Sequence, residues 1–269
     1  MSRKNLVFLF SLIFIILLSS CGSGSDVPYT SSDLTDELYS EDNIIGNENE
    51  TAAEQYSVGD VIFADGSVEK SESITDIDKN NLPIAVIAGF KDSDTAFGIG
   101  VHRSSEPLQW ALDDTIGYMT SFSNTICTQN NDMTFSGDTD GSDNWRELCI
   151  IDSEGADAAE INYPAFYFVN TYAESYDLSD ICASDWYMPS ISELCAIYEN
   201  REAINISLEK IYGLDNSAAM NGLASNWYWS SSQASVEDDY AWFVHFVNGY
   251  AGECPKNFDN LHVLAVHDF

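Results

Sequence analysis

The chain has 269 residues, and its 44 Asp and Glu residues outnumber its 10 Lys and Arg residues, for a formal net charge of −34. This charge excludes nucleic acid as a ligand, because phosphates need a basic patch, and it favours cations or a basic partner. No Cys-x-x-Cys occurs among the six cysteines, so neither a zinc ribbon nor a thioredoxin-type site is expected.

The N-terminus has the pattern of an export signal. Arg3 and Lys4 precede an apolar run from Leu6 to Leu18, which is shorter than the roughly 20 residues of a membrane-spanning helix. The run ends in Leu-Ser-Ser-Cys, which resembles a bacterial lipobox. The resemblance implies that residues 1–20 are a lipoprotein signal peptide. It also implies that fatty acids such as palmitate on Cys21 anchor the chain in the cell envelope, at the outer membrane or cell surface. The alternative is an ordinary signal peptide with a chance cysteine.

An acidic segment over residues 21–55 follows the predicted signal. Its part from Gly22 to Glu54 holds nine Asp or Glu residues and no Lys or Arg. Such a segment cannot bury enough apolar surface to offset the entropy of ordering it. We therefore expect a flexible tether.

The remaining cysteines suit an exported chain, in which disulfides are permitted. If Cys21 is acylated, five cysteines remain, and the odd number leaves one of them unpaired. They are Cys127, Cys149, Cys182, Cys195 and Cys254.

Residues 56–269 have a globular composition and are long enough for one sizeable domain. The pattern predicts a strand over 56–63, followed by an Asp-Gly turn at 65–66. Two further strands are predicted over 82–90 and 97–101. Helical spacing predicts helices over 156–172, from 191 onward and over 205–212, the first interrupted at Pro164. Ser190 and Glu193 form a capping box before the second helix. The C-terminal third returns to strands, so the predicted fold class is α+β.

Four segments in the second half carry a family resemblance: WYMPSISEL (186–194), NWYWSSSQ (226–233), YAWFVHFVNG (240–249) and VLAVHDF (263–269). They resemble the C-type lectin fold in its formylglycine-generating-enzyme-like branch. More closely, they resemble the collagen-like-adhesin C-terminal domain family and the variable surface lipoproteins of treponemes, some of which retroelements diversify. The stretch GDTDGSDNW (137–145) resembles the same treponemal proteins. The resemblance implies a single C-type lectin-like domain with short antiparallel strands and two or three helices. Relatives often end in Ala-Val-Arg-x-Phe, whereas this chain has His267 at the arginine position.

The strand after Tyr240 is the centre of the expected ligand surface. Side chains alternate along a strand, so residues 242, 244 and 246 are expected in the core. Residues 243, 245 and 247 then fall on the other face, which the resemblance equates with ligand contacts. Asn248-Gly249 predicts a hairpin turn, and Tyr, Ser and Asn side chains are adaptable contact residues. The alternative is a strand buried on both faces. The candidate ligand-binding residues are Val236, Glu237, Asp238, Asp239, Tyr240, Phe243, His245, Val247, Tyr250, Glu253, Asn257 and Asp259.

Asp138, Asp140 and Asp143 surround Gly141 and are the candidate metal ligands. Calcium prefers several oxygen ligands on a flexible loop, which makes calcium the candidate cofactor. The spacing departs from that of the EF-hand, whose loop ends in a bidentate glutamate. The alternative is a solvated acidic turn.

Catalytic motifs are absent from the sequence: there is no Gly-x-Ser-x-Gly, His-Glu-x-x-His or phosphate loop. A triad of Ser230–Ser232 with His245 and Asp238 or Asp239 is less expected than serines that satisfy nearby backbone groups. Formylglycine-generating enzymes use a cysteine pair in the C-terminal region, where this chain has only Cys254. We therefore expect a protein that is not an enzyme.

The expected function is that of a surface-anchored bacterial lipoprotein which binds an extracellular protein or glycan through a C-type lectin-like domain, as an adhesin or a diversified recognition protein. Two alternatives remain open. One is an enzyme of the formylglycine-generating type, and the other is a structural envelope lipoprotein without a specific ligand.

Overall fold

The structure is a computed structural model, and it describes residues 51–269. The predicted signal peptide, Cys21 and the tether up to residue 50 therefore lie outside the described residues. Helix α1 (Ala52–Gln55) has Thr51 as its N-cap, and Ala52 is buried. The folded part thus begins before Tyr56, and the last five residues of the predicted tether belong to it. Within residues 51–269 no helix is both long and apolar enough to span a membrane.

The first sheet contains five antiparallel strands in the order β10-β4-β3-β1-β2. They are β1 (Val61–Phe63), β2 (Val68–Glu69), β3 (Pro83–Phe90), β4 (Ala96–Arg103) and β10 (Leu264–Asp268). Gly66, with φ +83°, lies in the predicted Asp-Gly turn between β1 and β2. The apolar run of β3 reflects burial on both faces, since Val86 and Ile87 belong to two different core clusters. The C-terminal strand pairs with β4, where Val266 lies opposite Ile99.

The second sheet also has five strands, in the order β6-β5-β7-β8-β9. They are β5 (Ile126–Asn131), β6 (Thr134–Gly137), β7 (Trp227–Ala234), β8 (Tyr240–His245) and β9 (Tyr250–Pro255). The pair β5–β7 is parallel and the other pairs are antiparallel. The predicted Asn248-Gly249 hairpin is confirmed, because Gly249 has φ +75° and His245 pairs with Tyr250.

Residues 51–269 contain eight α-helices and one 3-10 helix, more than the two or three predicted. The predicted helix over 156–172 is divided mainly into two, Ala159–Asn162 and Pro164–Asn170, because Pro164 starts a new helix at a position where its missing N–H does no harm. The predicted helix over 205–212 lies inside a longer one. Besides α1, the elements are α2 (Asn144–Ile151), α3 (Ser153–Ala156), α4 (Ala159–Asn162), α5 (Pro164–Asn170), α6 (Tyr172–Ser175), the 3-10 helix (Asp180–Cys182), α7 (Ile191–Glu199) and α8 (Arg201–Leu214).

The predicted capping box at the start of α7 is confirmed. The Ser190 Oγ atom accepts a hydrogen bond from the Glu193 N–H at 3.2 Å, and the Glu193 carboxylate accepts one from the Ser190 N–H at 2.7 Å. These bonds satisfy two backbone donors that a helix start otherwise leaves free. They also bring the Glu193 carboxylate into the protein interior, where Glu193 is 4% exposed.

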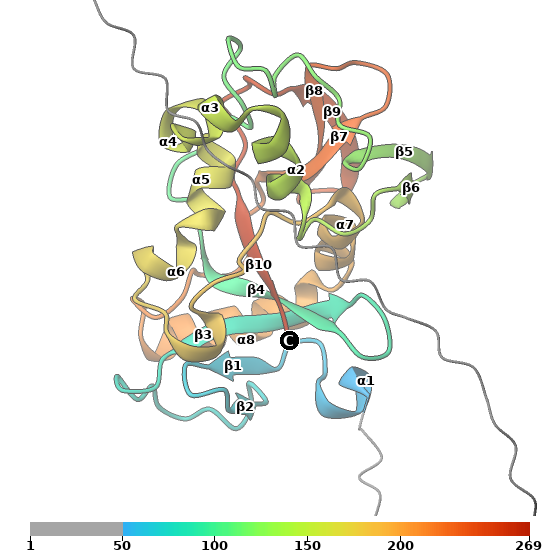
Figure 1. The fold of residues 1–269 in the computed structure, drawn as a ribbon. Coiled ribbons are helices and arrows are strands. Elements are labelled where there is room, and N and C mark those ends of the chain that lie inside the picture. The colour runs from blue at the N-terminus through green and yellow to red at the C-terminus, as the bar shows by residue number, and fades with distance from the viewer. Residues whose placement is uncertain (1–50) are drawn as a thin grey trace, which may run out of the picture. The chain divides into compact units, whose positions relative to one another are not determined.

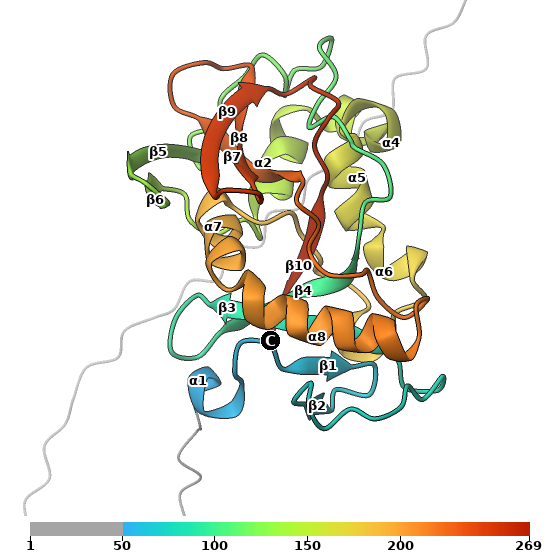
Figure 2. The same cartoon turned by 180° about the vertical axis from the view of Figure 1, so that it is seen from behind.

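Two hydrophobic clusters form the core. One includes Ile204, Leu208 and Ile211, which have helical spacing along α8 and face the first sheet. Figure 2 shows α8 lying across that sheet. The other cluster includes Phe166 and Val169 of α5, and Figure 1 shows α5 on the other side of the molecule from α8. The predicted α+β class is confirmed.

Candidate functional site

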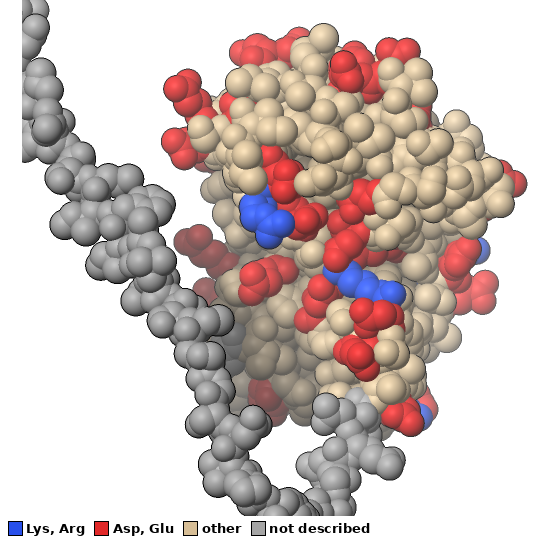
Figure 3. Space-filling model, turned by 45° about the vertical axis from the view of Figure 1, so that its right-hand side comes forward, with Lys and Arg blue, Asp and Glu red and all other residues tan. Residues whose placement is uncertain are grey.

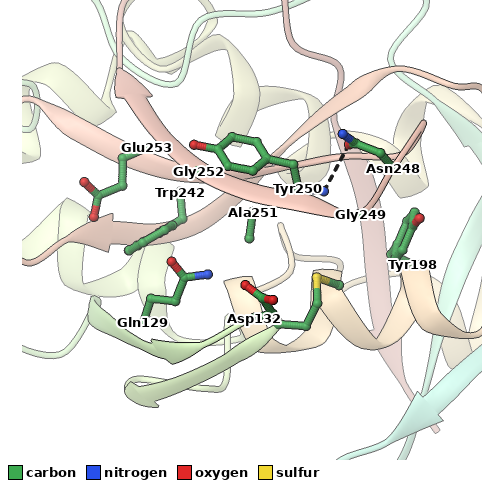
Figure 4. Close-up of a pocket in the computed structure, with 11 residues that line it drawn as sticks. Gln129, Asp132, Tyr198, Trp242, Asn248, Gly249, Tyr250, Ala251, Gly252 and Glu253 are labelled. Carbon is green, nitrogen blue, oxygen red and sulfur yellow. Dashed lines mark hydrogen bonds between the residues drawn. The ribbon is translucent and has the colours of Figure 1, made fainter.

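A groove of about 620 Å³ lies along β9. It is bounded by the β8–β9 hairpin, the β5–β6 hairpin and the C-terminal part of α7, as Figure 4 shows. No Lys or Arg is among its lining residues. The side chains that characterise it are Gln129, Asp132, Tyr198, Trp242, Tyr250 and Glu253.

The pairing of β8 with β9 builds the floor of the groove. Trp242 lies directly opposite Glu253, so both side chains are on the same face of the sheet. The Trp242 Nε1–H donates a hydrogen bond to the Cys127 carbonyl oxygen at 3.2 Å, and the Phe135 ring packs edge-on against Trp242 at 5.0 Å. These two contacts hold the indole in a fixed position.

The hairpin turn forms the end of the groove next to α7. Gly249 has φ +75°, and a Cβ atom there would lie 2.4 Å from Tyr198 Cε1. Only glycine therefore allows the turn to approach the tyrosine ring. The ring also packs against Phe246 at 5.4 Å, and the Arg201 Cζ atom lies 4.0 Å from its centroid.

Two carboxylates give the groove its charge. Asp132 is exposed and Glu253 is half-buried. Burial raises the pKa of Glu253, and the negative charge of Glu237 raises it further. Among the charged side chains on the face shown in Figure 3, acidic ones prevail, and the few basic ones lie against acidic neighbours.

The expected exposure of alternate residues along β8 is only partly correct. Trp242 and Val244 are buried in one core cluster, as predicted, but Phe243 is 3% exposed and belongs to the other cluster. The strand is thus buried on both faces, because Trp227 covers Phe243 on one face and Phe135 packs against Trp242 on the other. Val247 is exposed as expected, and His245 is half-buried beside Trp227, whose ring centroid is 5.0 Å away.

The other predicted contact residues are divided between the groove and nearby loops. Tyr250 and Glu253 line the groove, whereas residues 236–240, Asn257 and Asp259 are not among its lining residues. In the loop over 236–239, Asp238 accepts a hydrogen bond from Ser121 Oγ at 2.7 Å.

Sequence reasoning missed three polar residues of the groove: Gln129, Asp132 and Tyr198. They come from elements distant in sequence, which no local pattern connects to the hairpin. It also missed Trp227, which the alternation along β7 places on the opposite face of the sheet, with Phe243.

The three candidate metal ligands do not form a metal site. Asp140 lies 2.7 Å from Lys91 Nζ, and Asp143 lies 3.1 Å from the Arg146 guanidinium. Burial raises the pKa of Asp138. Across the described residues, no group of three or more His, Cys, Asp or Glu side chains is placed to hold a metal ion. The calcium prediction gains no support from this geometry.

A charge cluster around the buried Glu193 instead occupies this region. Besides Asp140, Lys91 Nζ lies 2.8 Å from Asp268 and 3.4 Å from Glu193. The Tyr187 hydroxyl is 2.8 Å from Glu193 and 2.7 Å from Asp268. Burial raises the pKa of Glu193, and the charge of Lys91 opposes this shift. The cluster connects the acidic loop and α7 to the C-terminal strand.

Lys256 is a second buried cation, and it is 0% exposed. Burial lowers its pKa to about 7, and the charges of Asp238 and Asp239 oppose the shift. Its ammonium group connects two loops by donating hydrogen bonds to the carbonyl oxygens of Gly117, Tyr118, Thr120 and Asp238.

The serine triplet does not form a triad with His245. Ser230 Oγ donates a hydrogen bond to the Trp242 carbonyl at 2.9 Å. Ser231 Oγ accepts one from the Asn144 amide at 2.8 Å, and Ser232 Oγ accepts one from the Ile191 N–H at 2.9 Å. All three serines are buried, so their hydroxyl groups fasten the strand to its neighbours.

The five described cysteines are all free thiols, and none forms a disulfide. Burial raises the pKa of the Cys127 thiol to about 11. It raises the pKa of Cys182, Cys195 and Cys254 to about 12, and it also raises that of Cys149. A raised pKa disfavours the thiolate, the reactive form of cysteine.

His267, at the position of the relatives' arginine, is a packing residue. It is 8% exposed, and its ring lies 5.2 Å from that of Trp186 and 5.0 Å from that of Phe269. Burial lowers its pKa below the usual histidine value. A neutral ring at neutral pH suits these aromatic neighbours.

The family model of the Lcl C-terminal domain matches residues 101–267, which is more than half of the chain and includes the whole groove. The chain belongs to the Lcl C-terminal domain family. The matched part of the Lcl domain begins inside β4, so β1 to β3 precede it.

A solved structure shares the fold of this Lcl domain protein. It is the crystal structure of a fimbrial protein from Bacteroides ovatus ATCC 8483, with a TM-score of 0.52 and 16% sequence identity. The match covers 79% of this chain and 48% of that chain, so this chain spans about half the length of the solved one. No curated protein matches the sequence. These comparisons do not confirm the expected assignment to the C-type lectin fold or to its formylglycine-generating-enzyme-like branch.

Proposed function

We propose that this protein is a lipid-anchored, adhesin-like surface protein whose Lcl C-terminal domain binds an extracellular protein or glycan in the groove along β9. The observation that carries the proposal is the groove itself, a concavity of about 620 Å³ with aromatic walls and a few amide and carboxylate groups. Ligand sites in proteins combine aromatic surface with convergent polar groups, and this groove has both. Tyrosine and asparagine at its rim also suit adaptable recognition.

A surface location is supported by two independent features. The chain belongs to the Lcl C-terminal domain family, and its fold is like that of a fimbrial protein. The N-terminal pattern ending at Cys21 is that of a lipoprotein. Replacing this cysteine, as Cys21→Ser, should abolish incorporation of a labelled fatty acid and move the protein from the membrane fraction to the soluble fraction. Unchanged labelling would contradict the anchor.

A binding role is better supported than catalysis. Raised thiol pKa values and serine hydroxyls that are already hydrogen-bonded disfavour nucleophilic chemistry at the positions that the sequence singled out. No observation favours the enzyme alternative. The alternative of a structural lipoprotein without a ligand differs from our proposal only in whether the groove is used.

Binding of the full-length protein to arrays of extracellular matrix proteins and glycans tests the proposal. Gln129 is exposed and lies beside Trp242 in the groove, so Gln129→Ala should leave folding intact and should weaken binding several-fold by removing an amide contact. Gln55→Ala is the matched control, because Gln55 is exposed in α1 and is neither a groove residue nor a predicted ligand contact. Equal binding by the two variants and the wild type would contradict a role for the groove.

A further inference from the structure

The groove has the chemistry of a site for a positively charged side chain. Asp132 and Glu253 enter it from two different hairpins, and the Trp242 ring lies between them (Figure 4). No basic side chain lines the groove to neutralise these carboxylates. A carboxylate beside an aromatic ring attracts an ammonium or guanidinium group through a charge-assisted hydrogen bond and the ring quadrupole.

The residues at the two ends of the groove indicate where a positively charged side chain would bind. At the α7 end, the Arg201 guanidinium already lies over the Tyr198 ring. The other end has Glu253 directly opposite Trp242 in the strand register.

The electrostatics of Glu253 agree with this position. Its half-buried carboxylate has a raised pKa because burial and the charge of Glu237 disfavour its ionised form. A bound cation stabilises the ionised form, so binding should weaken as the pH falls through that pKa. The whole-chain charge of −34 acts in the same direction, since it attracts basic proteins and repels sulfated or acidic glycans.

We infer that the ligand of the groove is a basic segment of a partner protein, with one Lys or Arg side chain inserted between Glu253 and Asp132 against Trp242. This inference rests on the proposed function and specifies its ligand class. A neutral glycan is the competing occupant, and it would not depend on the charge of the groove.

The test is a titration of the full-length, detergent-solubilised protein with a fluorescent peptide of alternating Gly and Lys. The matched probe is the same peptide with every lysine acetylated, which keeps the side chain and removes its charge. We expect at least tenfold tighter binding of the lysine peptide. Glu253→Gln and the exposed Asp132→Asn should each weaken it several-fold or more, while Glu174→Gln, an exposed carboxylate of α6 outside the groove, should change it less than twofold.

Three outcomes would overturn the inference. The acetylated peptide could bind as tightly as the lysine peptide, or Glu253→Gln could leave binding unchanged. Alternatively, Glu174→Gln could weaken binding as much as the groove variants, which would show general attraction to an acidic surface.

A further comparison separates this inference from the proposed function. If an array ligand loses affinity in Gln129→Ala but is neither displaced by the lysine peptide nor affected by Glu253→Gln, the basic-segment inference fails and the groove remains a binding site. If no array ligand responds to any groove variant, the proposed function fails as well.

Discussion

The ring of Trp227 lies flat on the ring of Phe243, with centroids 4.9 Å apart and an interplanar angle of 6°. Trp227 is 38% exposed, whereas the ring beneath it is 3% exposed. The tryptophan therefore shields the phenylalanine from solvent. The residue that the sequence suggested as an aromatic ligand anchor is part of the core.

The two partners of this stack should differ in their contribution to stability. Phe243→Ala removes a fully packed ring and should lower the free energy of unfolding by about 3–5 kcal/mol. Trp227→Ala removes a ring that is partly in solvent and should lower it by about 1–2 kcal/mol. Denaturant unfolding of both variants measures the difference, with the exposed Val247→Ala as the control. Equal losses in the first two would mean that Trp227 is as deeply packed as its partner.

Two glycines offer a matched pair of substitutions. Gly249→Ala forces a side chain into the left-handed region and toward the Tyr198 ring, so we expect a loss of at least about 1–2 kcal/mol. Gly213 lies in α8, and a Cβ atom there would meet nothing within 4 Å. Gly213→Ala should therefore stabilise the protein by up to about 1 kcal/mol. Thermal unfolding of both variants tests the pair, and a neutral Gly249→Ala would argue against the described turn.

The charge cluster around Lys91 predicts strong coupling between two residues. Lys91→Met leaves the 4% exposed Glu193 without its cation, which should cost about 3–5 kcal/mol of stability. Adding Glu193→Gln should restore part of this loss, because the buried negative charge is then removed. A double-mutant cycle in denaturant gives the coupling energy. Additive losses would show that the two side chains do not interact.

The lowered pKa of the buried Lys256 predicts that the stability of the protein depends on pH. Its pKa is about 7 in the folded state, against an ordinary value of 10.5. Between these values the unfolded chain binds more protons, so this residue makes the free energy of unfolding rise with pH, by up to about 1.4 kcal/mol per pH unit. The stabilisation is complete above pH 10.5 and is lost as the pH falls toward 7.

The variant Lys256→Met isolates that contribution. The free energies of unfolding of wild type and variant, measured at several values between pH 7 and 10, should diverge progressively in favour of the wild type. A constant difference across this range would mean that the buried ammonium group keeps its proton.

The burial and raised pKa values of the cysteine thiols predict slow alkylation in the native protein. Four of the five described cysteines are buried, and only Cys149 is partly exposed. In the native protein we expect iodoacetamide at pH 7.5 to modify Cys149 alone among these five, and slowly, since its pKa is raised. The other four should react only after unfolding. Rapid native labelling of Cys254, measured by mass spectrometry, would revive the enzyme alternative.

Local patterns were sufficient to predict several elements of the fold. The capping box at Ser190, the turn at Gly66 and the hairpin at Gly249 depend on residues that are close in sequence, and each is present. The division of the 156–172 helix also has a local cause, but the short helices around it depend on distant contacts as well. Asp152 caps the start of α3, and its carboxylate also accepts hydrogen bonds from the Ile116 N–H and the Tyr163 hydroxyl.

The candidate site was harder to predict, for a physical reason. Alternation along a strand shows which residues share a face, but it cannot show whether another element covers that face. Phe243 is covered by Trp227, and the opposite face at Trp242 is partly covered by the β5–β6 hairpin. The groove exists because this cover is incomplete, and its depth depends on contacts between segments about a hundred residues apart.

The pairing of β10 with β4 has a consequence for how the protein is made. One strand edge of the first sheet stays open until the residues up to Asp268 have been synthesised, and chains whose sheets join distant segments fold slowly. A polypeptide that crosses a membrane in the unfolded state benefits from such a delay, because it reaches the far side before its core can close. The order of the strands along the chain thus keeps the first sheet incomplete until the end of synthesis.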